Sequence, residues 1–444
     1  MKEKNQWASK LGFLLATAGS AIGLGNLWKF PYLMGKNGGF FFLIAYLVFV
    51  CLLGLPIMMT EMSIGRKFQQ NPIHAYEKIH PKAKAVGVIG VLAAFFILSY
   101  YSVIGGWIVK YFAQYAVTFQ APADFGGFIS NGWEPVLWHL LFMGATAAIC
   151  VFGVRGIEKS SKVMMPGLFA LLLVIILRSL TLPNAGEGLA FIFTPNQDGF
   201  TFGSISAALG QVFYSLSLCM GITITYGRYL SKEGNIPKSC LTVAGLDTMM
   251  AVLAGLAIFP AVFSFGLAPD NGPSLIFNTL PKVFEQLQGG TLFAVLFFLL
   301  VFFAAVTSAL ALLEVCVSFA IDKWGWGRRK ATLLVAGAAF LLGVPSALSY
   351  GVLSDISILS YDLFDFVGMI TDNLLLPVGG VLMCWFVGWK WKPQLLAEEM
   401  EEGGVRFRLK KAWLFCIRFI TPILVVIVTL TGFVSVFQHI TGQG

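Results

Sequence analysis

The sequence predicts an all-α protein that crosses a membrane many times. Of its 444 residues, 57% are hydrophobic and only 12% are charged, and the mean hydropathy is +0.80. A soluble domain cannot bury that much apolar surface, so the lipid bilayer must act as the solvent. Long apolar segments and an uneven placement of lysine and arginine support the same class.

Eleven apolar segments are long enough to span a hydrocarbon core roughly 30 Å thick, which takes about 20 residues of helix. They cover approximately 11–35, 40–65, 86–116, 136–153, 162–181, 206–230, 240–266, 290–321, 331–349, 361–389 and 412–437. The connections are short, so we expect one transmembrane domain over 1–444 and no soluble module. The polar start, MKEKNQWASK, lacks the apolar core of a cleavable signal peptide.

The placement of charge predicts the orientation. With a cytoplasmic amino terminus, five of the 30 lysines and arginines fall on the external half: Lys29, Lys36, Lys110, Arg178 and Lys282. The others, including the clusters at 65–67, 327–330 and 406–411, fall on the cytoplasmic side, as the positive-inside rule requires. Eleven crossings then put the carboxyl terminus outside. The net charge of +8 therefore reflects topology, and we expect no nucleic-acid partner.

The sequence lacks the patterns of a metal or nucleotide enzyme. Its seven cysteines lie in or beside apolar segments and its four histidines are scattered, without the spacing of a metal site. It has no Walker-type glycine-rich loop and no nucleophile–base pair among the intramembrane residues. We therefore expect neither ATP use nor catalysis.

Two of the apolar segments contain polar and glycine-rich interruptions. The first segment contains TAGSAIGLGNLWKF at 17–30, and the sixth contains YSLSLCMG at 214–221. Interruptions at matching places in two halves indicate a transporter built from inverted repeats, here about 8–181 and 206–390, with 412–437 as an extra helix. The alternative is that Gly19 and Gly23 only allow close helix packing. The nearby Asn26 and the second interruption make this less favoured.

An unwound helix in the membrane exposes amides and carbonyls that must find partners. Amides at a helix start attract an anion and freed carbonyls attract a cation, so a carboxylate with Na⁺ satisfies both. Side-chain oxygens at the same depth come from Asn26, Ser215, Asp247, Thr307 and Ser308.

Asp247, Glu61 and Glu314 are carboxylates inside apolar segments. A charge at mid-membrane, as at Asp247, costs about 2.5–3.5 kcal/mol, so a functional role is expected, although a neutral or paired buried carboxyl remains possible. For Glu61 and Glu314 we expect a role in pairing helices.

Five stretches carry a resemblance to a known family: NQWASKLGFLLATAGSAIGLGNLWKFPYLMGKNGG, GLPIMMTEMSIGR, YYSVIGGW, QVFYSLSLCMGITITYGRYL and FAAVTSALALLEV. The chain resembles the neurotransmitter:sodium symporter family, in particular its bacterial amino-acid transporters such as the leucine transporter and the multi-hydrophobic amino acid transporters. This implies the leucine-transporter fold, an inverted 5+5 repeat with helices 1 and 6 unwound at mid-membrane. It also implies symport driven by sodium, with alternating access.

The resemblance implies positions for one substrate and two Na⁺ ions. The substrate residues would be Ala21, Leu24, Gly25, Ile97, Tyr101, Tyr214, Ser215, Ser217, Met220, Ser308 and Leu312. The first Na⁺ would lie among Ala21, Asn26, Ser215 and Asp247, with the substrate carboxylate completing its shell. The second would lie among Gly19, Ile22, Ala304, Thr307 and Ser308.

The resemblance also implies gates. The external pair would be Lys29 with Asp365, where lysine lacks the two-pronged fork of the usual arginine. The cytoplasmic pair would be Lys4 with Asp322, with Trp7 and Tyr229 nearby. Gly156 and Pro166 match a Gly-x9-Pro motif whose unwinding opens a water path to the second Na⁺, and a simple proline kink is an equal alternative.

Departures from the family pattern bear on the ions. Tyr46, Gln211 and Ser215 match the chloride ligands of chloride-dependent relatives, but Ala251 replaces the fourth ligand, a serine. Asp247 stands where those relatives have asparagine, so a fixed carboxylate can replace the chloride charge and no chloride is expected. The same carboxylate, unpaired on the empty return step, can take up a proton, which would give proton antiport.

The substrate is expected to be a neutral hydrophobic amino acid, aliphatic or aromatic. Gly23 stands where monoamine carriers have an aspartate, which leaves room for the carboxylate of an amino acid. The implied cavity has no charged side chain, and Met220 can refit around different shapes. Cys219, where glycine is usual, adds bulk and weakens the argument from size.

A non-transporting amino-acid sensor on the same fold is the rival interpretation, and the absence of an attached sensory domain makes it less favoured. The short tails favour a bacterial inner membrane. The sequence leaves the oligomeric state open.

Overall fold

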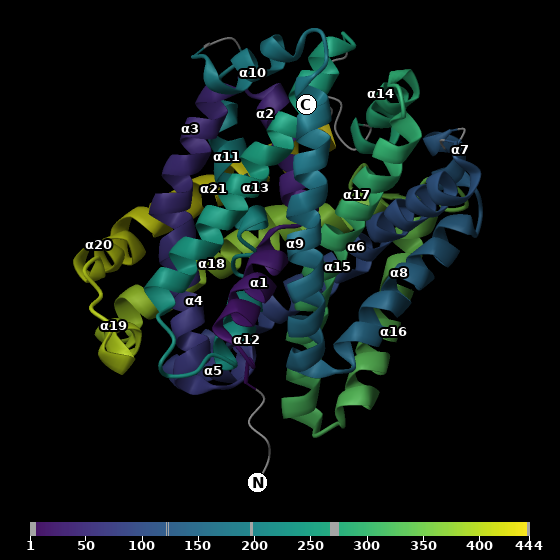
Figure 1. Ribbon diagram of the computed structural model, residues 1–444. Coiled ribbons are helices and arrows are strands. Elements are labelled where there is room, and N and C mark those ends of the chain that lie inside the picture. The colour runs from purple at the N-terminus through teal and green to yellow at the C-terminus, as the bar shows by residue number, and fades with distance from the viewer. Residues whose placement is uncertain (1–5, 121, 123, 196–198, 267–274, 442–444) are drawn as a thin grey trace.

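The computed structural model describes residues 6–120, 122, 124–195, 199–266 and 275–441 (Figure 1). Over these residues the regular structure is helical apart from a hairpin of β1 (Ser357–Ile358) and β2 (Tyr361–Asp362). The α-helices are α1 (Lys10–Ala21), α2 (Phe30–Lys36), α3 (Phe40–Phe49), α4 (Leu55–Phe68), α5 (Pro72–Ile79), α6 (Lys84–Thr118), α7 (Phe125–Ser130), α8 (Glu134–Cys150), α9 (Gly153–Leu180), α10 (Ala185–Phe193), α11 (Phe202–Ser215), α12 (Ile222–Arg228), α13 (Ile236–Ser264), α14 (Leu280–Gln286), α15 (Gly290–Trp324), α16 (Arg328–Leu348), α17 (Leu363–Met369), α18 (Leu376–Trp385), α19 (Gln394–Glu401), α20 (Lys410–Phe415) and α21 (Thr421–Thr441).

Short π- and 3-10-helical stretches join or extend these helices. The π-helical ones are η1 (Gly25–Lys29), η2 (Val50–Gly54), η4 (Leu275–Thr279), η5 (Ile370–Leu375), η6 (Phe386–Lys390) and η8 (Cys416–Ile420), and the 3-10 turns are η3 (Pro81–Ala83) and η7 (Glu402–Gly404). Because η2, η5, η6 and η8 follow an α-helix directly, they extend runs that are continuous along the chain.

Within the described residues, eight helical runs are long and apolar enough to cross a membrane, or nine if α1 and the run Gly25–Lys36 form one bent span. The two other segments expected from the sequence are shorter in the structure. The segment 136–153 corresponds to α8, which has 17 residues, and 206–230 is divided between α11 with 14 and α12 with seven.

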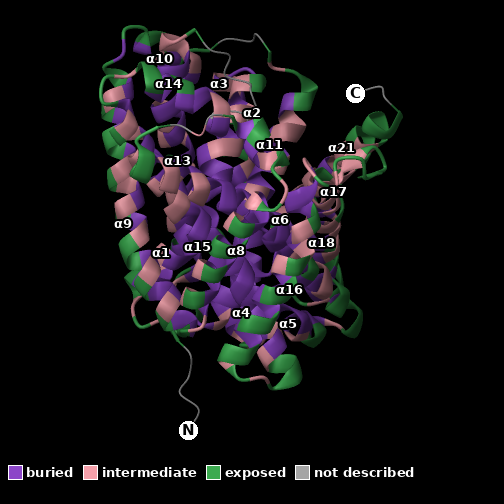
Figure 2. Cartoon of the chain, turned by 90° about the vertical axis from the view of Figure 1, so that its right-hand side faces the viewer, coloured by how far each residue is buried: buried purple, intermediate pink, exposed green. Residues whose placement is uncertain are grey.

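The interior is built around α6 and α15, which pack against each other and have the most buried apolar faces. Figure 2 shows buried residues concentrated in the middle of the molecule, whereas α9 and the end of α21 show more exposed residues. The C-terminal run Lys410–Thr441 is the least buried of the long spans. A face that is apolar but exposed is expected where helices meet lipid.

Both interrupted segments are broken at the centre of the molecule. The helix α1 ends at Ala21, and the runs on either side of the break are bent by 49°. Between α11 and α12, Ser217, Cys219 and Gly221 have φ values of 51°, 60° and 73°. This left-handed region costs a non-glycine residue roughly 1–2 kcal/mol, which explains why glycine is usual at position 219.

The helix α9 corrects one expectation. It begins at Gly153 rather than near 162 and runs without a break to Leu180, with Pro166 inside it. The apolar count missed its first turns because they carry Arg155, Glu158, Lys159 and Lys162. The stretch from Gly156 to Pro166, which the resemblance implied could unwind, is therefore helical in this structure.

Candidate functional site

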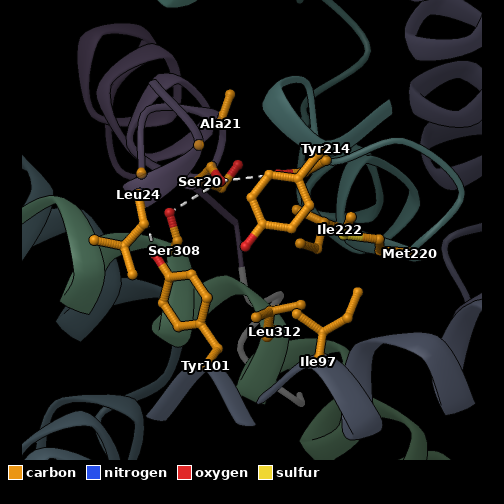
Figure 3. A pocket seen from close by; sticks show the side chains of 13 residues that line it. Ser20, Ala21, Leu24, Ile97, Tyr101, Tyr214, Met220, Ile222, Ser308 and Leu312 are labelled. Carbon is orange, nitrogen blue, oxygen red and sulfur yellow. Dashed lines mark hydrogen bonds between the residues drawn. The ribbon is translucent and has the colours of Figure 1, made fainter. Parts of the chain in front are cut away.

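The two breaks face each other across a narrow cavity of about 30 Å³ (Figure 3). Its walls also include residues of α6 and α15, and Figure 3 shows Tyr101, Ile97 and Leu312 opposite Tyr214 and Met220. The lining residues are Ser20, Ala21, Gly23, Leu24, Gly25, Ile97, Tyr101, Tyr214, Ser217, Met220, Ile222, Ser308 and Leu312. The structure thus brings together all the expected substrate residues except Ser215, whose hydroxyl instead donates to Asp247.

One end of this cavity is polar and the rest is apolar. The amide of Leu24 donates to the Tyr101 hydroxyl at 3.4 Å. The Ser20 carbonyl accepts from the Ser217 hydroxyl at 2.9 Å and from the Ser308 hydroxyl at 3.3 Å. The remaining side chains include those of Ile97, Met220, Ile222 and Leu312, and no lining residue is charged. This arrangement can hold a small polar group at one end of an apolar molecule.

Close packing explains Gly23. A Cβ atom at this position would lie 2.4 Å from the Ser308 hydroxyl oxygen and 3.1 Å from that of Tyr101. Any side chain would therefore displace the two hydroxyls that stand beside the break.

Three of the four residues expected at the first Na⁺ site are joined by hydrogen bonds. The Asn26 amide nitrogen donates to Ser215 Oγ at 3.1 Å and to Asp247 Oδ1 at 2.8 Å. The other carboxylate oxygen, Oδ2, accepts from Ser215 at 2.8 Å and from Tyr46 at 3.0 Å. Asn26, Ser215, Asp247 and Tyr46 are all fully buried. The fourth expected residue, Ala21, lines the adjoining cavity.

Oxygen atoms that could bind a cation converge here, without a cluster of acidic, histidine or cysteine ligands among the described residues. Among the residues that the structure describes, no group of three or more His, Cys, Asp or Glu could hold a metal. A site with one carboxylate and several neutral oxygens suits a weakly held alkali cation better than a transition metal. Gln211, one of the positions matched to a chloride site, donates its amide to the Gly25 carbonyl at 2.9 Å.

The residues expected at the second Na⁺ site lie where α1 approaches α15. The Thr307 hydroxyl donates to the Ala304 carbonyl at 3.0 Å, and the Ser308 hydroxyl lies 3.5 Å from the Gly19 carbonyl. A Cβ atom at Gly19 would lie 3.2 Å from Thr307 Cβ. Ile22, the fifth expected residue, is fully buried at the break itself.

The prediction that Lys29 pairs with Asp365 is wrong, because the acidic partner is a different aspartate. Lys29 pairs with Asp372 at 3.0 Å, not with Asp365, and its ammonium lies 4.2 Å from the centre of the Tyr214 ring. Asp365 lies seven residues earlier, in the first turn of α17, about 10 Å away along a helix axis. Both aspartates line an outer cavity of about 540 Å³ together with Tyr214, which also lines the central cavity, and Asp372 is the less exposed of the two.

Next to the amino-terminal end of α1, aromatic rings pack against α12. The Trp7 indole donates to the Tyr226 carbonyl at 3.2 Å and contacts the rings of Tyr226 and Tyr229. The carboxylate of Asp322 accepts hydrogen bonds from Nη1 and Nη2 of Arg228, at 2.7 and 3.0 Å. Lys4, its expected partner, lies outside the described residues.

Glu61 and Glu314 link helices, as expected. Glu61 accepts from the Thr223 hydroxyl at 2.5 Å and from the Cys219 amide at 3.3 Å, so it joins α4 to the second break. Glu314 accepts from Tyr229 at 2.9 Å and pairs with Arg328, which joins α15 to α12 and α16.

Sequence reasoning missed several residues that the structure places at the site. Ser20 and Ile222 line the central cavity, Asp372 holds Lys29, and Arg228 holds Asp322. Ser20 is flanked by predicted residues, so its position carried a signal. The sequence carried no signal for the two new ion-pair partners, Asp372 and Arg228. Each has a residue of the same charge nearby that fits the family pattern equally well.

Comparison with known proteins agrees with the geometry. The model of the Sodium:neurotransmitter symporter family matches residues 4–124 and 130–442. A sodium-dependent transporter of Bacillus subtilis (strain 168), YhdH, is 43% identical over 96% of this chain and 97% of its own length. A sodium-dependent transporter of Haemophilus influenzae is 33% identical over 97% and 98%.

Among solved structures, the crystal structure of MhsT in complex with L-phenylalanine is similar, with a TM-score of 0.89 and 44% identity over 96% of this chain and 99% of that one. Members of the matched family are transporters rather than enzymes, and the matched relatives use sodium. The resemblance seen in the sequence is confirmed, and the chain belongs to the sodium:neurotransmitter symporter family.

Proposed function

We propose that this protein is a sodium-coupled symporter for neutral hydrophobic amino acids that works by alternating access. The carrying observation is that two broken helices meet at one cavity, with polar backbone and hydroxyl groups at one end and apolar side chains at the other. The amides of Leu24 and Gly25 and the Tyr101 hydroxyl would receive the substrate carboxylate. The carbonyls around the second break would receive its ammonium group.

The substrate class is argued from the apolar part of the cavity. An acidic or basic side chain would be buried there without a partner, which costs several kcal/mol. The MhsT structure holds L-phenylalanine, and this favours inclusion of aromatic amino acids. Because the cavity is narrow, a bulky substrate requires Met220 or Tyr214 to move aside.

Two Na⁺ ions would travel with each substrate molecule. One would lie among Ala21, Asn26, Ser215 and Asp247, and the other among Gly19, Ile22, Ala304, Thr307 and Ser308. Asp247 would replace the charge of chloride, which makes transport chloride-independent. On the return step it would carry a proton, which gives proton antiport.

The proposed topology has eleven crossings, an inverted 5+5 repeat and one additional helix. The amino terminus is cytoplasmic and the carboxyl terminus external, in the inner membrane of a bacterium. The break between Ala21, where α1 ends, and Gly25, where η1 begins, and the split between α11 and α12 support counting each interrupted segment as one crossing.

The test is counterflow of labelled phenylalanine, leucine, tyrosine and tryptophan into proteoliposomes that contain the full chain. We expect accumulation in Na⁺ and little in K⁺. Sodium-dependent binding to the detergent-solubilised protein without any accumulation would favour the sensor instead. If the protein neither binds nor takes up any hydrophobic amino acid, the proposal is contradicted.

A further inference from the structure

One carboxylate ties the start of α1 to α9. Glu158 accepts from the Ala8 amide at 2.7 Å and from the Ser9 hydroxyl at 2.8 Å. Ser9 is the N-cap of α1 and in turn accepts from the Gly12 amide at 3.0 Å. The negative charge also faces the positive end of the α1 dipole. Glu158 is 3% exposed, so water does not replace these contacts easily.

The contact leaves no space for a side chain at position 12, which is glycine. A Cβ atom there would lie 2.1 Å from Glu158 Oε1, so the first turn of α1 rests directly on this carboxylate. Helix α1 packs along α9 beyond this point as well. Its other end carries Gly19, whose carbonyl lies beside Ser308 at the proposed second Na⁺ site.

The position of Glu158 depends on helical structure in a weak part of α9. Its third partner is Lys162 at 2.6 Å, a pair at i and i+4 that exists only while this turn is helical. Four residues further on, Pro166 has no N–H, so the Lys162 carbonyl loses its usual partner within the helix. The turn that orients Glu158 therefore adjoins a turn of α9 that lacks one backbone hydrogen bond.

We propose that Glu158 is the positioning residue that couples loss of helix between Gly156 and Pro166 to release of the α1 amino terminus. When the turn is helical, Lys162 holds the carboxylate under Ala8 and Ser9. When the turn unwinds, the carboxylate leaves, and α1 loses its cap contacts and is free to tilt. Opening of a cytoplasmic path along α9 and movement of α1 are then one event. This inference rests on the proposed function, because it assigns a step to the carrier.

Hydrogen–deuterium exchange of the full chain in nanodiscs tests this coupling, read at peptides covering 8–15 and 153–166 in Na⁺ and in K⁺. In Lys162→Gln, we expect exchange to rise in both peptides together. In Glu158→Gln, we expect exchange of 8–15 to rise by at least about tenfold even in Na⁺, and no longer to follow 153–166. Lys159→Gln removes the same charge from an exposed neighbour on the same turn and should behave like the wild type.

Faster exchange of 153–166 in Lys162→Gln without a change in 8–15 would overturn the coupling. So would unchanged exchange of 8–15 in Glu158→Gln. If Glu158→Gln does not fold, Gly12→Ala displaces the same carboxylate and should loosen 8–15 alone. A wild type that does not respond to Na⁺ counts against the proposed function, whereas the comparison of the variants still decides the coupling.

Discussion

Asp247 shows how a single residue can set the charge of the proposed ion site. Its carboxylate is fully buried, and it collects donors from Asn26, Ser215 and Tyr46, which come from three different elements. A neutral amide at this position would offer one acceptor oxygen and would point N–H groups at existing donors. The site would then lack the negative charge that balances a cation.

Asp247→Asn should therefore reduce sodium-dependent uptake about tenfold or more in chloride-free buffer, the equivalent of losing about 1.4 kcal/mol. Chloride should restore part of the uptake by the variant and have no effect on the wild type. Uptake in gluconate and chloride buffers measures this. A variant that does not respond to chloride would contradict replacement of the anion by the carboxylate.

Gly23 is a second single residue that limits the shape of the central cavity. Gly23→Ala places a methyl group against the Ser308 and Tyr101 hydroxyls. Overpacking of this kind costs about 1–3 kcal/mol, so the apparent affinity for phenylalanine should fall roughly ten- to hundredfold. Equilibrium binding to the purified protein measures it.

Gly210→Ala is the matched control for Gly23→Ala. Gly210 lies within α11, and a Cβ atom there would meet nothing within 4 Å. Its binding should equal that of the wild type. Equal losses of affinity in both variants would mean that the effect of Gly23→Ala is not local crowding.

At the scale of elements, the run α17–η5 decides how the central cavity is covered. It presents two aspartates seven residues apart to the same outer cavity, and Lys29 takes the deeper one, Asp372. This choice holds the Lys29 ammonium over the Tyr214 ring, where a cation–π contact adds about 0.5–1 kcal/mol at a half-exposed site.

Asp372→Asn should therefore speed substrate dissociation roughly two- to fivefold, because a partly exposed ion pair is worth about 1 kcal/mol or less. Asp365→Asn should change the rate much less. Dissociation of labelled substrate after dilution distinguishes the two. A larger effect from Asp365→Asn would reassign the external partner of Lys29.

At the scale of the whole molecule, a buried ion pair anchors the peripheral helix α19 to the transmembrane core. Arg66 on α4 is fully buried and pairs with Glu399 of α19 at 2.7 Å, and Lys232 binds the same carboxylate at 2.9 Å. Figure 1 shows α19 and α20 at one edge of the bundle, where the apolar side chains of Leu396, Ala397 and Met400 on α19 are also buried.

Glu399→Gln should destabilise the protein by about 3–5 kcal/mol, because it leaves Arg66 buried without a counter-charge. Glu77→Gln removes one partner of an exposed pair with Lys84 and should cost less than about 1 kcal/mol. Thermal unfolding midpoints in detergent compare the two variants. Equal midpoints would mean that α19 is not anchored by this pair.

Much of this architecture followed from local pattern. Apolar length located the long helices, and the clustering of Gly, Ser and Asn at matching places in two apolar runs located both breaks, because such interruptions are the sequence signal of discontinuous helices in inverted-repeat transporters. The residues around the cavity were placed by resemblance, and the structure brings nearly all of them together. The start of α9 was missed because a charged helical turn beyond the membrane has no apolar signal.

Composition already requires a membrane-embedded helical chain, since hydration of apolar surface depends on residue type alone, and the charge asymmetry predicts its orientation. The choice of partners depended on three-dimensional placement. Asp372 rather than Asp365 meets Lys29, Arg228 meets Asp322, and Glu158 sits under the first turn of α1. Each pairing depends on a separation of a few ångströms between segments distant in sequence, and helix rotation and tilt, which no local pattern encodes, set that separation.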